Sequence, residues 1–305
     1  MSLPCPARGH APARPRGPAA LTAAWTAALV CLGALLGPGA RADEPALPGV
    51  DITADVVYGH KDGLALTYDV FRPRAKEGDA PAPCLLFMVS GGWVSQWMPP
   101  AAMAPFTRPL LDRGYTVCTV RHGSSPRYVI PEIVTDVRKA LAHVADHAAD
   151  HGIDPKRIGV FGASAGGHLS LMLGTTTNDT AAEAPRVAAV AAIFPPTDLG
   201  PYLDPAAGFL ERFPALKFPR EQGERFSPLH QVSADDAPTL LVHGDKDELV
   251  SLWHSEKIHD AFTAAAVPTR LLVIEGAAHG FDADGNRRMF EAMAEWFDEH
   301  LAAGK

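Results

Sequence analysis

The amino-acid sequence predicts an α/β protein in which a mostly parallel central sheet is covered by helices on both faces. Three observations support this class: an early pair of strand-like runs around a turn, strand-length apolar runs after it, and helical segments between those runs. The runs at 83–90 and 115–120, PCLLFMVS and YTVCTV, are almost entirely apolar, as in strands buried on both faces. The 305 residues are 47% hydrophobic and 20% charged, which suits one large domain.

The predicted elements alternate along the chain. A hairpin from about residue 54 to 73 turns at Asp62-Gly63, and a helix at about 99–113 ends before Gly114. Further strands, separated or followed by helical segments, lie at 157–162, 187–194, 238–244 and 269–276. Because ligands of such a sheet bind beyond the carboxyl ends of its strands, we expect the chemistry in the residues that follow each strand.

Two helices show apolar residues at helical spacing. The helix predicted at 131–151 has Ile133, Val137, Leu141, Val144 and Ala148 on one face. The last helix has Phe290, Met293, Phe297 and Leu301. His143, His147 and His151 are spaced by four residues on the first of these helices, and we interpret them as a solvated face rather than a metal site.

Residues 1–42 have the pattern of a secretory signal peptide. Three arginines precede the apolar stretch ALTAAWTAALVCLGALLG, and a small-x-small site follows at Ala40-Arg41-Ala42. We therefore expect cleavage after Ala42, a single mature domain at 43–305, and a secreted or periplasmic location. The alternative is an uncleaved membrane anchor, because the apolar run is near the length that spans a bilayer.

The charge balance excludes one class of partner. Residues 1–42 contain four basic and no acidic residues, so their removal changes the net charge from −8 to −12. A mature chain this acidic argues against nucleic acid as a partner and has no basic patch for an anionic membrane. Cys84 and Cys118 remain in the mature chain, and we expect free buried thiols because both lie inside predicted strands.

The segment GASAGG at 162–167 places one hydroxyl, Ser164, between a predicted strand and a predicted helix. Gly162 and Gly166 lie two residues away on either side, where a sharp strand-to-helix turn leaves no room for side chains. Such a turn holds serine in a strained conformation, exposes its Oγ and directs the free N–H groups of the helix start toward the same point. We predict that Ser164 is a nucleophile.

A serine nucleophile needs a base and an acid that orients the base. The loop after the last strand carries His279 in AAHGF, and the loop after the preceding strand carries Asp245, Asp247 and Glu248. We predict His279 as the base and Asp247 as the acid, since Asp247 lies far enough along its loop to reach the next one. Asp198, in FPPTDL, is the reserve acid and otherwise a turn residue.

The segment SGGW directly after the first buried strand is the predicted oxyanion loop. Gly91, Gly92 and Trp93 can present backbone N–H groups there, and the Ala165 N–H joins them from the turn after Ser164. We assign Gly92, Trp93 and Ala165 as the oxyanion donors.

These segments together resemble the α/β-hydrolase superfamily, in particular its secreted carboxylesterase branch with acetylxylan and feruloyl esterases. The resemblance covers residues from about 54 to 303, through GASAGGHLSLML, SPLHQVSADDAPTLLVHGDKDELV and EGAAHGF. It implies the same roles for Ser164, Asp247 and His279. Relatives usually carry His-Gly-Gly-Gly in the oxyanion loop, whereas this chain reads MVSGGWVS, so the positions of the donors are less well defined.

Three further features bear on the site. Residues 199–230, interrupted by Pro and Gly, predict a short irregular cap that leaves the site open to esters on large or polymeric substrates. His168 follows Ser164 by four residues on the predicted helix, and we interpret it as a packing residue. Trp93 and Trp97 fit either a substrate cleft or the core.

The sequence therefore predicts a secreted serine esterase that needs no cofactor or metal and acts on small-molecule or polysaccharide-linked esters by an acyl-enzyme mechanism. The first alternative is a peptidase of the prolyl oligopeptidase type, which shares this catalytic domain but usually has a large N-terminal propeller. A second alternative is a binding protein of the same fold without catalytic activity, against which the complete set of Ser164, Asp247 and His279 argues.

Overall fold

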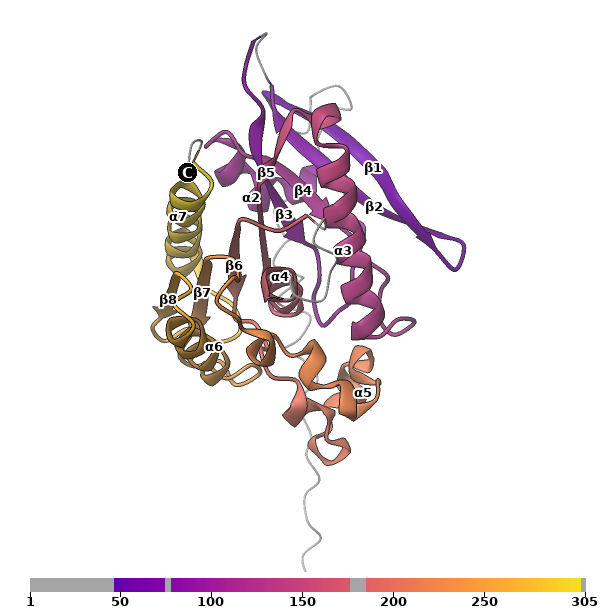
Figure 1. The fold of residues 1–305 in the computed structure, drawn as a ribbon, viewed down its shortest axis with the longest axis vertical. Helices are drawn as coiled ribbons and strands as arrows, with labels where there is room; N and C mark the ends of the chain where they lie inside the picture. The colour runs from indigo at the N-terminus through magenta and orange to yellow at the C-terminus, as the bar shows by residue number, and fades with distance from the viewer. Residues whose placement is uncertain (1–46, 75–77, 176–184, 303–305) are drawn as a thin grey trace, which may run out of the picture. The chain divides into compact units, whose positions relative to one another are not determined.

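The computed structural model of the chain describes residues 47–74, 78–175 and 185–302. The predicted signal peptide, 1–42, lies outside the described residues. The remaining chain, Asp43–Lys305, forms one compact unit. Its centre is an eight-stranded sheet in the order β1-β2-β4-β3-β5-β6-β7-β8 (Figure 1).

The sheet is parallel except at its first edge. β1 (Val50–Lys61) and β2 (Leu64–Pro73) form the predicted hairpin, and β2 pairs antiparallel with β4. Asp62 and Gly63 at its turn both have positive φ, 48° and 79°, which matches the preference of Asp-Gly for this kind of turn. The other strands pair in parallel: β3 (Ala82–Met88), β4 (Thr116–Val120), β5 (Ile153–Ala163), β6 (Ala189–Ile193), β7 (Thr239–Gly244) and β8 (Thr269–Ile274).

Helices cover both faces of the sheet, as predicted (Figure 1). One face packs against α3 (Ile130–Asp146), α4 (Ala165–Thr175) and α6 (Trp253–Ala264). The other packs against α2 (Pro100–Leu111) and α7 (Ala283–His300). In β3, Cys84, Leu86 and Met88 join the first core and Leu85 the second, because successive strand side chains point to opposite faces.

The helix predicted at 131–151 is shorter than expected. α3 ends at Asp146, and a separate 3-10 helix, η2 (Ala148–His151), follows and ends at Gly152 with φ 60°. The break comes at His147, which leaves helical geometry at φ −106°. The predicted helix is therefore wrong beyond Asp146: His147 is the C-cap of α3 and His151 lies in η2, so the three histidines do not lie on one continuous helix.

The cap consists of short helical turns. Between β6 and β7 lie α5 (Phe209–Arg212) and six 3-10 helices: η4 (Gly200–Leu203), η5 (Pro205–Ala207), η6 (Pro214–Leu216), η7 (Arg220–Gln222), η8 (Glu224–Phe226) and η9 (Pro228–Gln231). Figure 1 shows this segment in orange tones around α5. The frequent prolines and glycines of the segment explain why no turn extends into a long helix.

The two described cysteines are free and buried, as expected. Cys84 on β3 and Cys118 on β4 have Sγ atoms 3.6 Å apart, and burial raises the pKa of the Cys84 thiol. No helix within the described ranges is long and apolar enough to cross a membrane.

Candidate active site

Ser164 occupies the turn between β5 and α4 with a φ of 54°, a left-handed conformation that is uncommon for residues other than glycine. A Cβ at Gly162 would lie 2.5 Å from the Gly166 carbonyl carbon, and one at Gly166 would lie 2.6 Å from Met88 O. The predicted steric reason for both glycines is confirmed. Since β5 runs straight into α4 here, the serine hydroxyl projects beyond the carboxyl end of the sheet.

Three loops bring Ser164, His279 and Asp247 into one hydrogen-bonded chain. Ser164 Oγ lies 2.9 Å from His279 Nε2, and His279 Nδ1 lies 2.6 Å from Asp247 Oδ2. A carboxylate can only accept, so Nδ1 carries the ring proton and Nε2 accepts from the serine hydroxyl. The predicted nucleophile, base and acid are therefore in contact in the order that proton transfer requires.

The acid loop after β7 and the histidine loop after β8 are bonded to each other. Lys246 N donates to Ala277 O at 2.9 Å, and Gly276 N donates to the Asp245 carboxylate at 2.6 Å. Gly244 permits this approach, because a Cβ there would lie 2.2 Å from Ala277 O. Asp245, a weaker acid candidate in the sequence, thus has a structural contact, and it holds the loop that carries His279.

Asp247 is surrounded by hydrogen-bond donors. Its Oδ1 accepts from the backbone N–H groups of Leu249 and Val250 at 2.9 and 3.0 Å, and its Oδ2 faces His243 Nε2 at 3.4 Å as well as His279. Burial alone would raise the pKa of Asp247, but the hydrogen bonds from His243, His279 and Val250 outweigh it and lower the pKa well below its ordinary range. The carboxylate is thus ionised at neutral pH.

Sequence reasoning missed His243. This buried side chain lies on β7, its Nε2 donates to Val250 O at 2.8 Å, and its Nδ1 accepts from the Ser255 hydroxyl at 2.7 Å. It thereby fixes the loop that carries Asp247. The spacing of four residues between His243 and Asp247 was visible, but a contact between a strand residue and the loop beyond it leaves no recognisable pattern.

Asp198, the reserve acid, has partners of its own. Its Oδ1 accepts from Gly200 N at 2.9 Å and lies 3.5 Å from His230 Nε2. These are the contacts of a turn residue, the alternative interpretation of Asp198.

The predicted oxyanion loop is a tight turn. Gly91 and Val94 exchange two backbone hydrogen bonds of 3.0 Å, and the central residues, Gly92 and Trp93, have positive φ of 56° and 60°. Such a conformation is rare for a residue as bulky as Trp93. Outside the helices and strands that the structure describes, the backbone N–H groups of Gly92, Trp93 and Ala165 donate no hydrogen bond to a backbone carbonyl. Gly92 and Trp93 line the same pocket as Ser164.

The turn Gly91–Val94, the predicted oxyanion turn, is anchored by residues that follow β4. The Ser90 hydroxyl donates to His122 Nε2 at 2.9 Å, because His122 Nδ1 donates to Gly123 O at 2.8 Å. The Ser95 hydroxyl donates to Val89 O at 2.7 Å and faces His122 N at 3.4 Å. Burial lowers the pKa of His122 to about 4, so it is neutral at pH 7. In addition, Gly166 N donates to Ser90 O at 3.2 Å, which ties the turn to α4.

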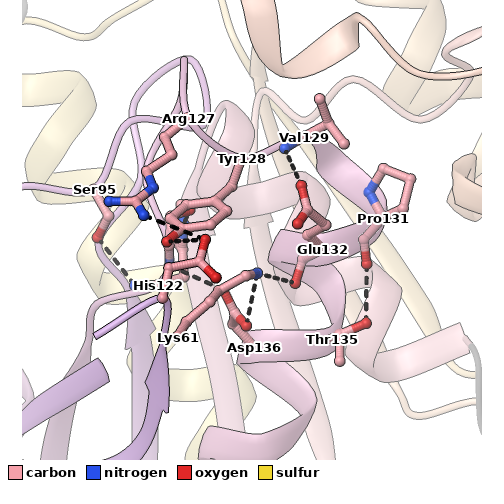
Figure 2. A network of polar contacts seen from close by, with 12 residues as sticks. Lys61, Ser95, His122, Arg127, Tyr128, Val129, Pro131, Glu132, Thr135 and Asp136 are labelled. Carbon is pink, nitrogen blue, oxygen red and sulfur yellow. Dashed lines mark hydrogen bonds and ion pairs between the residues drawn. The ribbon is translucent and has the colours of Figure 1, made fainter. Parts of the chain in front are cut away.

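A partly buried ion pair between Lys61 and Asp136 supports this anchor. Figure 2 shows the Lys61 amine reaching the Asp136 carboxylate and the Glu132 backbone; Lys61 Nζ lies 3.0 Å from Asp136 Oδ2. Asp136 Oδ2 also accepts from Gly123 N at 3.0 Å. The Lys61 amine lies 4.4 Å from the ring centre of Tyr128. The residue after His122 is thus fixed to α3 and to the end of β1.

The cap, the turn Gly91–Val94 and the loop after β7 surround a pocket of about 330 Å³, its open mouth included. Ser164 and Gly92 lie on its wall, and none of the residues that line it carries a formal charge. The other lining residues are Trp93, Pro196, Tyr202, Phe209, Phe213, Leu216, Leu249 and Val250. Trp97 is 58% exposed and is not among them, so it belongs neither to the core nor to this pocket.

Trp93 is held by His168, which is fully buried as expected of a packing residue. Trp93 Nε1–H donates to His168 Nδ1 at 3.3 Å, and His168 Nε2–H donates to Phe226 O at 2.8 Å in the cap. Burial lowers the pKa of His168 to about 4. The His168 side chain therefore links the turn Gly91–Val94, α4 and the cap.

Among the residues that the structure describes, no group of three His, Cys, Asp or Glu side chains is arranged to hold a metal ion.

A mostly parallel eight-stranded sheet with a strained serine between strand and helix defines the α/β-hydrolase fold. The BD-FAE family model matches residues 68–262, and the chain belongs to this family.

Known proteins agree with this class. The chain is 31% identical over 248 residues to the esterase LipC of Mycobacterium tuberculosis, covering 76% of this chain and 60% of that one. It spans about three fifths of the length of the mycobacterial relatives that it matches. Among solved structures, it is similar to propionate-bound esterase 2 of Thermogutta terrifontis, with 25% identity, a TM-score of 0.70, and 86% of this chain and 98% of that one covered. It is also similar to a truncated carbohydrate esterase from gut microbiota, with 25% identity, a TM-score of 0.68, and coverage of 82% and 96%.

Proposed function

We propose that the chain is a serine carboxylesterase in which Ser164 is the nucleophile, His279 the general base and Asp247 the acid that orients it. The observation that carries this proposal is the continuous hydrogen-bonded chain from Ser164 Oγ through His279 to Asp247, at 2.9 and 2.6 Å. The relatives described above are named as esterases, which supports the same reaction.

The proposed reaction has two halves. Ser164 Oγ attacks the ester carbonyl while His279 Nε2 takes its proton, and the ionised Asp247 stabilises the imidazolium. Backbone N–H groups of Gly92, Trp93 and Ala165 bind the oxyanion of the tetrahedral intermediate. His279 then gives the proton to the leaving alcohol, and water, activated by the same nitrogen, releases the acid from Ser164.

The pocket supports a short, uncharged acyl group. Its lining is aromatic and aliphatic apart from Ser164 and the Tyr202 hydroxyl, and it has no charged side chain to receive the terminus of a peptide. A small acid on a sugar hydroxyl is consistent with this lining, with the propionate bound to one structural neighbour and with the carbohydrate esterase among the others.

We also propose export of the chain, with the signal peptide 1–42 removed after Ala42 to leave the catalytic domain at 43–305. The basic start, apolar run and small-x-small site of the sequence support this. N-terminal sequencing of the protein from intact cells and from the culture medium or periplasm tests it, and a retained Met1 in the exported fraction would contradict it.

The decisive experiment for the function compares the wild-type protein with Ser164→Ala on 4-nitrophenyl acetate. We expect loss of about 10⁴-fold or more in kcat with an unchanged unfolding transition. Equal rates would reject the assignment. A panel of acetylated xylan, feruloylated sugars, and short and long aryl esters then defines the substrate, and cleavage of a peptide alone would favour the prolyl oligopeptidase type.

A further inference from the structure

Tyr202 and His254 form a polar pair at the pocket that the proposed reaction does not use. Tyr202 lies in η4 at the start of the cap and lines the same pocket as Ser164. His254 lies in the first turn of α6 and is 5% exposed. Tyr202 Oη lies 2.7 Å from His254 Nε2, and the two rings stack with centroids 5.4 Å apart.

The backbone fixes which nitrogen of His254 carries the proton. Nδ1 faces the backbone N–H of Thr197 at 3.2 Å and that of Asp198 at 3.4 Å, and both of these groups can only donate. Nδ1 is therefore the acceptor. Burial lowers the pKa of His254 to about 4, so at neutral pH the ring has a single proton, and this proton lies on Nε2.

This arrangement determines the role of the Tyr202 hydroxyl. Its oxygen accepts from His254 Nε2–H, so its own proton is left for another acceptor. Burial, reinforced by the negative charges of Asp247 and Asp198, raises the pKa of Tyr202 far above the ordinary value, so the proton stays on the phenol. Across the described part of the chain, His254 is the only hydrogen-bond partner of this hydroxyl.

We propose that Tyr202 donates a hydrogen bond to an oxygen of the substrate that lies next to the reacting ester group. The inference rests on the proposed esterase function and specifies its substrate class: esters in which an ether or hydroxyl oxygen is close to the ester. A sugar ester carries such an oxygen on the alcohol side, and an alkoxy or hydroxy acid carries it on the acyl side.

The surroundings make this donor selective. The rest of the pocket wall is largely apolar, including Phe209 and Phe213 of the cap, so a substrate without an acceptor would remove water from the Tyr202 hydroxyl without replacing it. Sites built to hydrogen-bond a substrate atom discriminate against the analogue that lacks it. We expect a preference of about tenfold, the contribution of one neutral hydrogen bond.

The test uses two pairs of esters in which one CH₂ group is exchanged for oxygen. The alcohol-side pair is 2-methoxyethyl acetate and butyl acetate, and the acyl-side pair is ethyl methoxyacetate and ethyl butanoate. In Tyr202→Phe, kcat/KM for the oxygen-containing ester of one pair should fall about tenfold, while that of its carbon partner stays within about twofold. Intrinsic differences in ester reactivity cancel, because each ester is compared between variant and wild type.

A matched control is Tyr115→Phe. Tyr115 is also buried and its hydroxyl donates to Asp298 at 2.7 Å, but it packs on the opposite face of the sheet. Tyr115→Phe should leave the ratio of kcat/KM values within each ester pair unchanged. His254→Leu keeps the phenol but removes the group that orients it, and it should reduce the same preference by a smaller factor, about threefold.

The outcomes separate the two proposals. If the wild-type protein cleaves the four esters and Tyr202→Phe leaves both ratios unchanged, or lowers all four rates equally, the role of Tyr202 is wrong while the esterase function stands. If the wild-type protein cleaves none of the esters above the Ser164→Ala background, the proposed function itself fails. The pair that responds identifies the side of the ester that Tyr202 contacts.

Discussion

Ser164 has an unfavourable backbone conformation, and its neighbours keep it there. A left-handed φ of 54° costs a serine about 1–2 kcal/mol. The backbone N–H of Ser164 donates to Ile193 O on β6 at 2.8 Å, and Gly162 and Gly166 touch each other directly. The close contact of these glycines leaves the chain no alternative path from strand to helix.

We expect Gly162→Ala to destabilise the protein by about 3 kcal/mol or more, because a new Cβ would lie 2.5 Å from backbone atoms of Gly166 that cannot move aside. Activity should fall further than stability, since Ser164 would be displaced from His279. Gly59→Ala is the matched control: no atom lies within 4 Å of its Cβ position. Urea denaturation and kcat measurements on both variants check this, and equal behaviour of the two would contradict it.

The same substitution at Asp247 and at Asp198 tests which of the two residues is the acid that orients His279. Asp247→Asn should lower kcat by about 10⁴-fold, because an amide cannot hold His279 with its proton on Nδ1. Asp198→Asn should change kcat less than about threefold, since that carboxylate bonds to Gly200 and His230 instead. Steady-state kinetics on one aryl ester decide it. A larger loss at Asp198 would show that the acid has been assigned to the wrong residue.

At the scale of elements, the turn Gly91–Val94 depends on the segment after β4. It is short, and both of its central residues have positive φ. Its position relative to Ser164 depends on the bond of Ser90 with His122 and on that of Ser90 O with Gly166 N. The position of this turn is therefore fixed by residues outside it, His122 and Gly166.

Removal of that support should affect the transition state more than substrate binding. We expect Ser90→Ala to lower kcat about tenfold with little change in KM, because looser oxyanion donors mainly affect the charge that develops during reaction. Thr135→Ala, which removes a hydroxyl bonded to Pro131 O on the exposed side of α3, is the control. A rise in KM at constant kcat would instead mean that the turn serves only binding.

The strands and most helices could be predicted because each depends on a local pattern. Continuous apolar runs marked β3, β4 and β7, and the Asp62-Gly63 pair marked the first hairpin. The end of α3 could not be predicted, because apolar spacing continues to Ala148 although the helix stops at Asp146. His147 shows no breaker signal in the sequence.

The candidate site also has a part that could be predicted from the sequence and a part that could not. Ser164, Asp247 and His279 follow strands, so their convergence could be expected from the geometry of a parallel sheet. The contacts Ser90–His122 and Tyr202–His254 join residues 32 and 52 positions apart through side chains alone. No local pattern contains that information, and a single sequence does not provide it.

At the scale of the whole molecule, burial lowers the pKa of three histidines in different parts of the described chain to about 4. They are His122 after β4, His168 on α4 and His254 on α6. In the unfolded chain their pKa is about 6.5. Between these values the unfolded chain binds more protons, so acid favours unfolding.

The free energy of unfolding should therefore fall as the pH decreases from about 6.5 to 4. Burial raises the pKa of Asp236 to about 6, so the folded state takes up a proton there below pH 6. This uptake offsets the contribution of one histidine to the pH dependence of the free energy of unfolding. For these four groups, the net difference of about two protons corresponds to a loss of about 3 kcal/mol per pH unit near pH 5. Urea denaturation at pH 7, 6 and 5 measures the free energy of unfolding at each pH. In His168→Gln, its slope against pH should be smaller by the contribution of about one proton. A flat profile would contradict the account.

The most direct measurement of the central claim identifies the residue that becomes covalently modified. The protein is treated with an activated alkyl phosphonate ester, digested, and mapped by mass spectrometry, with His279→Ala as the comparison. We expect one adduct per chain, on Ser164, formed at least about 10³-fold more slowly when His279 is replaced. An adduct on another residue, or unreduced labelling of Ser164 without His279, would contradict the account.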